Sequence, residues 1–405
     1  MSAHPAMAQK SALARRRFAP SPLSRLLLTC LVGLTLAGKI ACAQENTVFQ
    51  LDTALARYRQ LGADPAIQAA WDEPLPPWGA SGSRKLEPGK PYAGLPILMR
   101  RLIALGDLPP DTAVPARYEA PVTDGVMAFQ RRHGLEPDGV IGKDTLSQLN
   151  VPPLARIHQI ELNLERLRQS PLPAAPRLIV VNIPEFILRA YATEGGQPVL
   201  KTRMKIIVGN ARGTRTPIFT EDMRYIEFSP YWNIPPSIAR KETIPKLRRD
   251  PQYFAEQGFE FYTNGGTVIT SLTNENLEAV LSGKMRIRQR PGTKNALGGI
   301  KFVFPNRDNI YMHHTPATQL FTHARRDFSH GCIRVEEPLA LARFVLQDAP
   351  EWNDERLLAA MTSGRSATLR LKEPLPVVIT YFTASADEDG RVHFFPDIYG
   401  RDTIE

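Results

Sequence analysis

Residues 311–335 combine one thiol with several imidazoles. The stretch reads Tyr-Met-His-His-Thr-Pro-Ala-Thr-Gln-Leu-Phe-Thr-His-Ala-Arg-Arg-Asp-Phe-Ser-His-Gly-Cys-Ile-Arg-Val and holds four of the eight histidines. A thiol attacks carbonyl groups as its thiolate, and a neighbouring imidazole can remove the thiol proton. Gly331, beside Cys332, lets backbone N–H groups turn toward a carbonyl oxygen that becomes negative. These residue types at this spacing indicate acyl transfer.

Two structural alternatives are open for the same residues. A lone cysteine often packs as a small buried hydrophobic side chain, although the polar context Ser329-His-Gly331 is unlike a core. A zinc site would need several ligands facing one ion. His313 and His314 are adjacent, so on a strand they point to opposite faces. We therefore expect no metal and no other cofactor.

The run Ser329-His-Gly-Cys-Ile-Arg334 with an upstream histidine resembles the active-site signature of L,D-transpeptidases, the YkuD domain family. His313 and His314 precede Cys332 by 19 and 18 residues, so spacing admits either one as the base. Ile310-Tyr-Met-His313 followed by a Thr-Pro step resembles the large periplasmic, YcbB-like members, which favours His313. His314 stands where those relatives have Asp. The group that orients the base is therefore open, and a backbone carbonyl could serve.

This resemblance implies a two-step reaction on peptidoglycan. The thiolate attacks a tetrapeptide donor stem and releases D-alanine, and a diaminopimelate amine of a second stem then takes the acyl group in a 3–3 cross-link. β-Lactams, carbapenems above all, are implied inhibitors, and other cell-wall synthesis proteins are possible partners. The implied residues are Cys332 and His313 for catalysis; Gly331, His330, Ser329 and His314 for the oxyanion or for support; and Arg334, Tyr311 and Trp232 for the substrate.

Alternatives are open for several of these roles. The same thioester could pass to water or to a lipoprotein lysine, and a wall-binding protein could keep the fold without catalysis. Arg334 could hold the loop rather than a substrate carboxylate, and Trp232 could belong to a core. Arginines 286, 288 and 290 share one parity, so as a strand they would face either the acidic stem peptide or solvent.

The formal net charge of +9 does not indicate a nucleic-acid partner. Residues 1–43 hold six basic residues and no acidic one, so the rest of the chain carries only +3. No run of Lys and Arg with interleaved aromatic residues follows. We expect no nucleic-acid partner, and 405 residues allow two or three domains.

The start of the chain is typical of a secretory signal. Arg15–Arg17 and Arg25 precede the apolar run Leu26–Gly38, which is too short to span a bilayer comfortably. Ala41-Cys-Ala43 is a small-residue cleavage site. We therefore predict an exported, periplasmic protein, with an uncleaved inner-membrane anchor as the alternative.

The three cysteines are used unequally. Cys30 and Cys42 would leave with the signal, which leaves Cys332 without an internal disulfide partner. Lys39 stands where a lipoprotein signal at Cys42 would have an aliphatic residue, so lipidation is disfavoured. An exported protein that keeps one thiol either pairs it with another chain or uses it chemically.

The chain is predicted to be multidomain. Phe129–Thr145 resembles the type 1 peptidoglycan-binding domain, which implies docking to the cell wall, although relatives also keep this fold without clear binding. Helices are predicted over 95–105, 123–133 and 144–149. The predicted fold class is a small all-α domain followed by a mainly β L,D-transpeptidase domain. A helical or irregular lid inserted in the second domain is implied by the large periplasmic members.

The sequence predicts six divisions of the chain, together with further strands and helices. The divisions are a signal (1–43), an N-terminal segment (44–93), the helical domain (94–151), a helix and proline linker (152–176), the catalytic domain (177–373) with its lid (239–285), and a C-terminal β extension (374–405). Strands are predicted over 178–183, 186–191, 201–208, 224–228, 300–304, 310–313, 367–371, 377–382 and 392–395, and helices over 158–168, 335–346 and 355–361.

Overall fold

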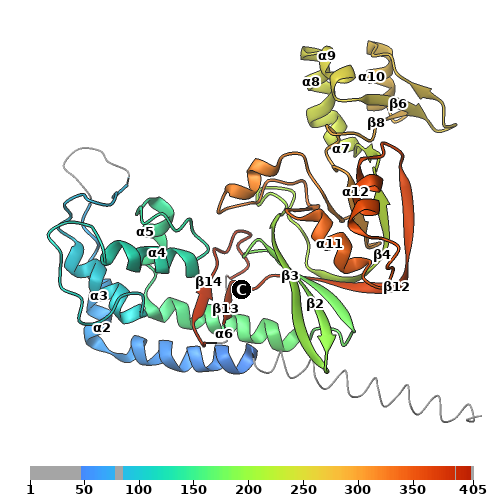
Figure 1. Ribbon diagram of the computed structural model, residues 1–405. Coiled ribbons are helices and arrows are strands. Elements are labelled where there is room, and N and C mark those ends of the chain that lie inside the picture. Colours follow the sequence, from blue (N-terminus) through green and yellow to red (C-terminus); the bar gives the residue numbers. More distant parts are fainter. Residues whose placement is uncertain (1–46, 78–84, 388, 403–405) are drawn as a thin grey trace, which may run out of the picture.

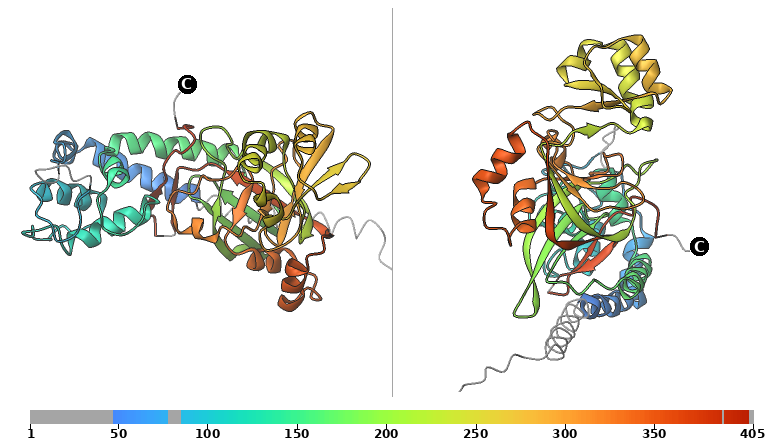
Figure 2. Two further views of the ribbon diagram at one scale, coloured as in Figure 1. Left: turned by 90° about the horizontal axis from the view of Figure 1, so that it is seen from above. Right: turned by 90° about the vertical axis from the view of Figure 1, so that its right-hand side faces the viewer.

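The computed structural model describes residues 47–77, 85–387 and 389–402. A helical unit, a β-barrel and a small lid follow one another through the molecule (Figure 1). The lid projects from the barrel at the end far from the helical unit, as the views in Figure 2 also show. The predicted signal at 1–43 lies outside the described residues.

The helical unit forms around short amphipathic helices. Residues 47–63 are helical, and α2 (Pro65–Asp72), α3 (Leu95–Leu105), α4 (Val122–Arg132) and α5 (Lys143–Leu149) follow. Gly106 ends α3 because its φ of 78° is a left-handed conformation that favours glycine. The three helices predicted for this region are confirmed to within one residue at each end.

The long helix α6 (Pro153–Gln169) connects the helical unit to the barrel. Proline at its first turn costs no hydrogen bond there and starts the helix. The helix lies beside residues 47–63, and both contribute buried side chains to one apolar cluster (Figure 2). The predicted helix at 158–168 thus begins five residues earlier than expected.

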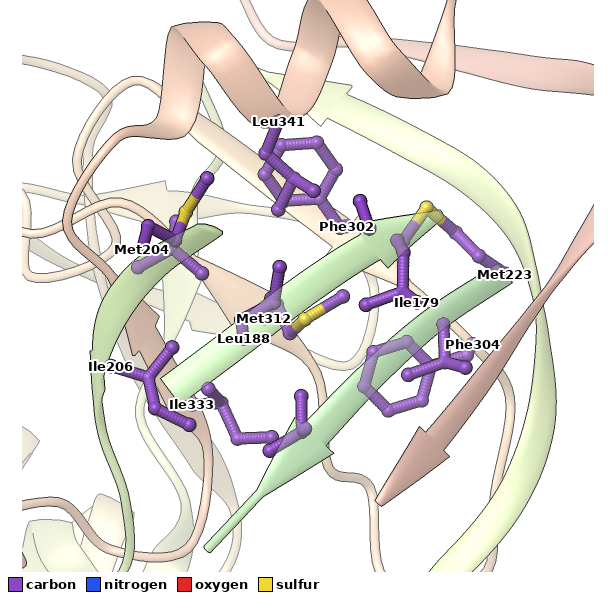
Figure 3. Close-up of a cluster of buried hydrophobic side chains, with 14 of the residues drawn as sticks. Ile179, Leu188, Met204, Ile206, Met223, Phe302, Phe304, Met312, Ile333 and Leu341 are labelled. Atoms are coloured by element: carbon purple, nitrogen blue, oxygen red, sulfur yellow. The ribbon is translucent and has the colours of Figure 1, made fainter. Parts of the chain in front are cut away.

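The barrel is closed by eight strands in the order β1-β12-β4-β9-β10-β11-β3-β2. Alternate side chains of these strands point inward, and Met312 and Ile333 are among the fully buried residues of the core (Figure 3). The strands are β1 (Arg177–Asn182), β2 (Ile187–Glu194), β3 (Gln197–Ile207), β4 (Phe219–Phe228), β9 (Ile300–Val303), β10 (Met312–His313), β11 (Ile333–Val335) and β12 (Ala367–Thr380).

The lid corrects one prediction. The inserted segment predicted as helical or irregular over 239–285 contains a four-stranded sheet with its own apolar core, and it runs from Trp232 to Gln289. Its strands are two to five residues long, which is too short to show a clear period of two. The lid consists of β5 (Trp232–Asn233), α7 (Pro236–Ile238), the π-helix η1 (Ala239–Thr243), α8 (Ile244–Arg249), α9 (Gln252–Glu256), β6 (Phe259–Thr263), β7 (Val268–Ile269), α10 (Asn274–Leu281) and β8 (Met285–Gln289).

The helix predicted at 335–346 begins later than expected. Strand β11 occupies Ile333–Val335, and α11 starts only at Pro338. The α11 N-terminus therefore does not follow Cys332 directly, because a strand of the barrel separates them. Helices α11 (Pro338–Val345) and α12 (Asp354–Thr362) pack on the barrel.

The end of the chain ties the two larger units together. β12 runs through the predicted division at 373–374, so the barrel continues to Thr380. The hairpin of β13 (Ala384–Ala386) and β14 (Val392–Phe394) then packs against α6 and the helix at 47–63. Among the described residues, no helix is both long and apolar enough to cross a membrane.

Asn163 on α6 makes buried hydrogen bonds to the C-terminal segment at Thr383. It is fully buried; its Nδ2 donates to Thr383 Oγ1 at 2.9 Å, and its Oδ1 accepts from the Thr383 N–H at 2.8 Å. Asn163→Ala would leave the buried Thr383 groups without partners, at a cost of about 1–3 kcal/mol. We expect faster amide hydrogen exchange across residues 383–395, whereas the exposed Gln169→Ala on the same helix leaves exchange there unchanged. Equal exchange in both variants would contradict this role of Asn163.

Candidate active site

Parallel pairing of β10 with β11 assembles the candidate site. Met312 lies opposite Ile333 and His313 opposite Arg334, and the Ile333 N–H donates to the Tyr311 carbonyl at 3.0 Å. Met312 and Ile333 point into the barrel core (Figure 3). The residues that alternate with them therefore lie on the opposite face of these strands. Four predicted site residues share that face: Tyr311, His313, Cys332 and Arg334.

His313 is oriented by a backbone carbonyl. Its Nδ1–H donates to the His314 carbonyl oxygen at 2.5 Å. A carbonyl can only accept, so Nδ1 carries the proton and Nε2 of the neutral ring is left to accept one. Burial, followed by the positive charge of Arg334, lowers the pKa of His313 to about 3. The neutral imidazole is thus held in the tautomer that a general base needs.

The His314 side chain acts elsewhere. Its Nδ1 accepts a hydrogen bond from the Gly299 N–H at 3.1 Å. A Cβ at Gly298 would come within 2.4 Å of the same ring nitrogen, so the imidazole fills the space that this glycine leaves. The sequence left open what replaces the Asp of the large relatives. In the structure the His314 main chain orients His313, and the His314 side chain packs beneath residues 298–299.

Cys332 is half-buried and is the free cysteine of the described chain. Burial raises the pKa of its thiol, and hydrogen bonds from the Tyr311 backbone and hydroxyl, with the charges of Lys301 and Arg334, oppose that rise without cancelling it. Lys301 Nζ lies 4.5 Å from the centre of the Tyr311 ring. Burial also raises the pKa of Tyr311, so its hydroxyl stays protonated beside the sulfur.

Ser329 closes the turn before Cys332. Its hydroxyl donates to the Cys332 carbonyl at 2.5 Å and accepts from the Gly331 N–H at 3.1 Å. Gly331 has a φ of 114°, a backbone conformation that L-residues with a side chain rarely adopt. The sequence predicted oxyanion donors near both Gly331 and Cys332. In the structure the Gly331 N–H has an acceptor in the Ser329 hydroxyl, and the oxyanion role of these N–H groups stays a prediction.

Two threonines that the sequence analysis did not single out hold the same turn. Thr214 Oγ1 donates to the Ser329 carbonyl at 2.9 Å, and Thr216 Oγ1 donates to the Gly331 carbonyl at 2.7 Å. Both come from the glycine- and threonine-rich loop 209–217. The fold brings this loop against residues 329–331, which lie more than 110 positions later in the chain.

Arg334 presents an unsatisfied donor. Its Nε is buried and has no hydrogen-bond partner among the described residues. Burial lowers the pKa of Arg334, and the nearby Cys332 sulfur opposes that shift. A buried guanidinium N–H without an acceptor is costly, so this donor marks a place where an acceptor group can be received.

His330 faces the lid. Its Nε2 lies 2.7 Å from the Glu242 carboxylate, in the π-helix η1. The His330 and Glu242 side chains keep 43% and 54% of their surface exposed, so the pair is a surface contact of modest strength. His330 thus links the Cys332 turn to the lid, and its supporting role in catalysis stays a prediction.

Trp232 belongs to the lid and not to strands β10 and β11. It begins β5 of the lid and packs partly buried against the lid core. No hydrogen bond or ring contact in the described part of the chain joins it to Cys332.

Among the residues described here, no group of three or more His, Cys, Asp or Glu side chains could hold a metal ion.

The family model YkuD, "L,D-transpeptidase catalytic domain", matches residues 176–378, which is half of the chain. The chain belongs to this family. The model PG_binding_1, "Putative peptidoglycan binding domain", matches residues 94–149, which include α3, α4 and α5.

Individual proteins match the chain with low to moderate sequence identity. A Haemophilus influenzae protein named "Putative L,D-transpeptidase" is 34% identical over 247 residues, which is 60% of this chain and 48% of the relative. The chain thus spans about half the length of this curated relative. A crystal structure of the L,D-transpeptidase from Xylanimonas cellulosilytica is 15% identical over 75% of this chain and 100% of that one, with a TM-score of 0.23. A Bdellovibrio bacteriovorus structure is 13% identical over 54% and 52%, also at 0.23.

The charge state of this YkuD site predicts how its thiol titrates. Burial holds the pKa of the Cys332 thiol above its usual value of 9.0, and His313, with a pKa of about 3, is neutral near pH 7. Alkylation by iodoacetamide requires the thiolate. Its rate should therefore rise about tenfold per pH unit between pH 6 and 9, without a plateau.

Intact mass followed by peptide mapping measures this rate at Cys332. A rate that levels off below pH 7 would contradict the prediction, since it would show a thiolate–imidazolium pair already formed in the free protein. Cys332→Ser provides the background labelling.

Proposed function

We propose that this protein is an L,D-transpeptidase that forms 3–3 cross-links between peptidoglycan stem peptides through a thioester on Cys332. The observation that carries the proposal is the shared strand face that presents this thiol together with the correct tautomer of His313. A thiol, a base oriented by a carbonyl and a neighbouring backbone N–H are the parts that acyl transfer needs. Membership of the YkuD family supports the same reaction.

The first step transfers the donor stem to sulfur. His313 Nε2 takes the thiol proton while Sγ attacks the carbonyl carbon of the third residue of a tetrapeptide. The carbonyl oxygen becomes negative and accepts a hydrogen bond from the Cys332 N–H. The Ser329 hydroxyl binds the Gly331 N–H and leaves the Cys332 N–H free for this bond. The C–N bond to D-alanine then breaks. His313 gives its proton to the departing amine, and the thioester remains.

The second step releases the acyl group to an amine. A diaminopimelate side-chain amine of a neighbouring stem attacks the thioester carbonyl and gives its proton to His313 Nε2. The C–S bond breaks, and the sulfur recovers a proton from the imidazole. No cofactor is needed, because the sulfur carries the acyl group between the two stems.

Arg334 and Tyr311 would contact the donor. The Arg334 Nε has no partner among the described residues, and its guanidinium interacts electrostatically with Cys332, so this donor suits a substrate carboxylate or carbonyl. The Tyr311 hydroxyl faces Cys332 and would be displaced by, or donate to, the bound acyl group. The lid, linked to the Cys332 turn through Glu242, would cover the bound stem, and Trp232 in β5 would act only from that lid.

The other units suit a cell-wall substrate. The helical unit matched at 94–149 would dock the protein on peptidoglycan, and the substrate lies outside the cytoplasm, which agrees with an exported protein of the large periplasmic type. The proposed domains keep the sequence-based divisions, with the lid extended to Trp232–Gln289 and the barrel to Thr380. Carbapenems would acylate the same sulfur. Transfer to water or to a lipoprotein lysine is the competing use of the thioester.

Incubation with tetrapeptide muropeptides tests the proposed function. We expect mass spectrometry to show cross-linked dimers that have lost one D-alanine, because the stem held on sulfur is passed to a second stem. The Cys332→Ala variant should form none. A tripeptide monomer as the sole product would show hydrolysis instead, and dimers formed by the Cys332→Ala protein would refute the assignment of the nucleophile.

The two adjacent histidines should differ sharply. His313→Ala removes the acid–base group and should lower turnover about a thousandfold. His314→Ala keeps the carbonyl that orients His313 and removes only the acceptor of the Gly299 N–H. His314→Ala should therefore lower the melting temperature, and it should lower turnover far less than His313→Ala does. Initial rates of dimer formation measure turnover in both variants, and thermal unfolding measures their stability. A larger loss of rate in His314→Ala than in His313→Ala would show that His314 is the base.

A further inference from the structure

We propose that Tyr399, near the C-terminus, is a positioning residue for acyl transfer that acts through Thr216 and Gly331 on the direction of the Cys332 N–H. This inference rests on the proposed function, since an oxyanion donor matters only if Cys332 attacks a carbonyl. The hydrogen bonds that carry it connect the end of the chain to the turn that bears the nucleophile.

The Tyr399 hydroxyl bridges both ends of the loop 209–216. It donates to the Gly209 carbonyl at 2.6 Å and accepts from the Thr216 N–H at 3.1 Å. The side chain is only 1% exposed, and the Arg215 guanidinium lies 5.6 Å from the centre of its ring. Burial raises the pKa of Tyr399, so the hydroxyl keeps the proton that it donates.

Thr216 transmits this constraint to the Cys332 turn. Its hydroxyl accepts from the Gly209 N–H at 2.9 Å and donates to the Gly331 carbonyl at 2.7 Å. Gly209 has no room for a side chain, because a Cβ there would lie 1.9 Å from the Thr214 carbonyl oxygen. The loop is therefore closed tightly on itself, and its Thr216 hydroxyl is aimed at one acceptor.

Because the peptide unit is planar, the hydrogen bond from Thr216 to the Gly331 carbonyl also sets the direction of the Cys332 N–H. The Gly331 carbonyl and the Cys332 N–H belong to one peptide unit, and in a trans peptide they point in opposite directions. Holding the carbonyl against Thr216 therefore holds the N–H on the other side. The Gly331 N–H is bound to Ser329, so the Cys332 N–H is the donor that this arrangement leaves available.

The tail around Tyr399 is itself firmly held. The Tyr399 N–H donates to the Tyr381 hydroxyl at 2.7 Å, and the Tyr381 hydroxyl donates to Asp397 Oδ1 at 2.5 Å. The Asp397 carboxylate also accepts the N–H groups of Arg401 and Asp402, both at 2.8 Å. Such a network would also be expected if the tail served stability alone, so the test must separate positioning from stability.

Two reactions of one sulfur make that separation. Acylation by a carbapenem passes through a tetrahedral oxyanion, whereas alkylation by iodoacetamide needs the thiolate but forms no oxyanion. The Tyr399→Phe variant removes only the bridging hydroxyl. We expect its carbapenem acylation rate, followed by intact mass, to fall at least about tenfold while its alkylation rate stays within about twofold.

Thr216 supplies the second variant and the conservative rescue. Thr216→Val keeps the shape but removes the hydroxyl, and should slow acylation at least as much as Tyr399→Phe. Thr216→Ser keeps the hydroxyl and should restore most of the rate. The double variant Tyr399→Phe/Thr216→Val should be no slower than Thr216→Val alone, because both residues act on the same carbonyl.

Tyr118→Phe is the matched control. Tyr118 is fully buried in the helical unit and donates to the Gly139 carbonyl, so its loss costs similar stability far from the turn. It should lower the melting temperature as Tyr399→Phe does and leave acylation unchanged.

Two results would overturn the inference. Equal losses of acylation and alkylation in Tyr399→Phe would show a general disturbance of the thiol, and no loss of either would show that the tail only stabilises the fold. A wild-type protein that is alkylated but never acylated would instead remove the proposed function, and the inference would fall with it.

Discussion

The parallel pairing of two very short strands is the constraint on which the candidate site depends. β10 and β11 have two and three residues, yet they lie inside a closed barrel between β9 and β3. Met312 and Ile333 anchor them because both are fully buried in the core (Figure 3). A slip of one residue would turn His313 into that core and expose Met312. The barrel core therefore fixes the face on which the thiol and the imidazole meet.

The same burial sets the chemistry of the resting site. It raises the pKa of the thiol and lowers that of the imidazole, so both groups are neutral before substrate arrives. In the proposed reaction, proton transfer would then accompany attack on the carbonyl, and the Cys332 N–H would stabilise the negative charge that forms on its oxygen. Lys301 and Arg334 lower the cost of the thiolate without forming it in advance.

The extent of sequence-based prediction follows from how local each feature is. The Ser-His-Gly-Cys run and the Thr-Pro step after His313 are local patterns, so a nucleophile and a base could be proposed from them, and both roles stay predictions. The bond from the His313 ring to the His314 carbonyl was foreseen only as one option. The three helices of the small unit and most barrel strands also have clear periodicity.

Long-range contacts could not be foreseen. Thr216 meets Gly331 across 115 positions and Tyr399 meets Gly209 across 190, and no local pattern encodes either contact. The engagement of the Gly331 N–H by Ser329 needs the actual turn geometry. The lid sheet was missed because its strands pair segments as short as Val268–Ile269.

The central claim is that the Cys332 sulfur carries a stem peptide between donor and acceptor. The most direct measurement is rapid acid quenching of the protein during turnover of a tetrapeptide donor, followed by intact mass and mapping of the modified peptide. The account predicts a transient adduct of the donor minus D-alanine on Cys332, which decays when acceptor is added. Cross-linked product formed while this sulfur stays unmodified at every time point would contradict it.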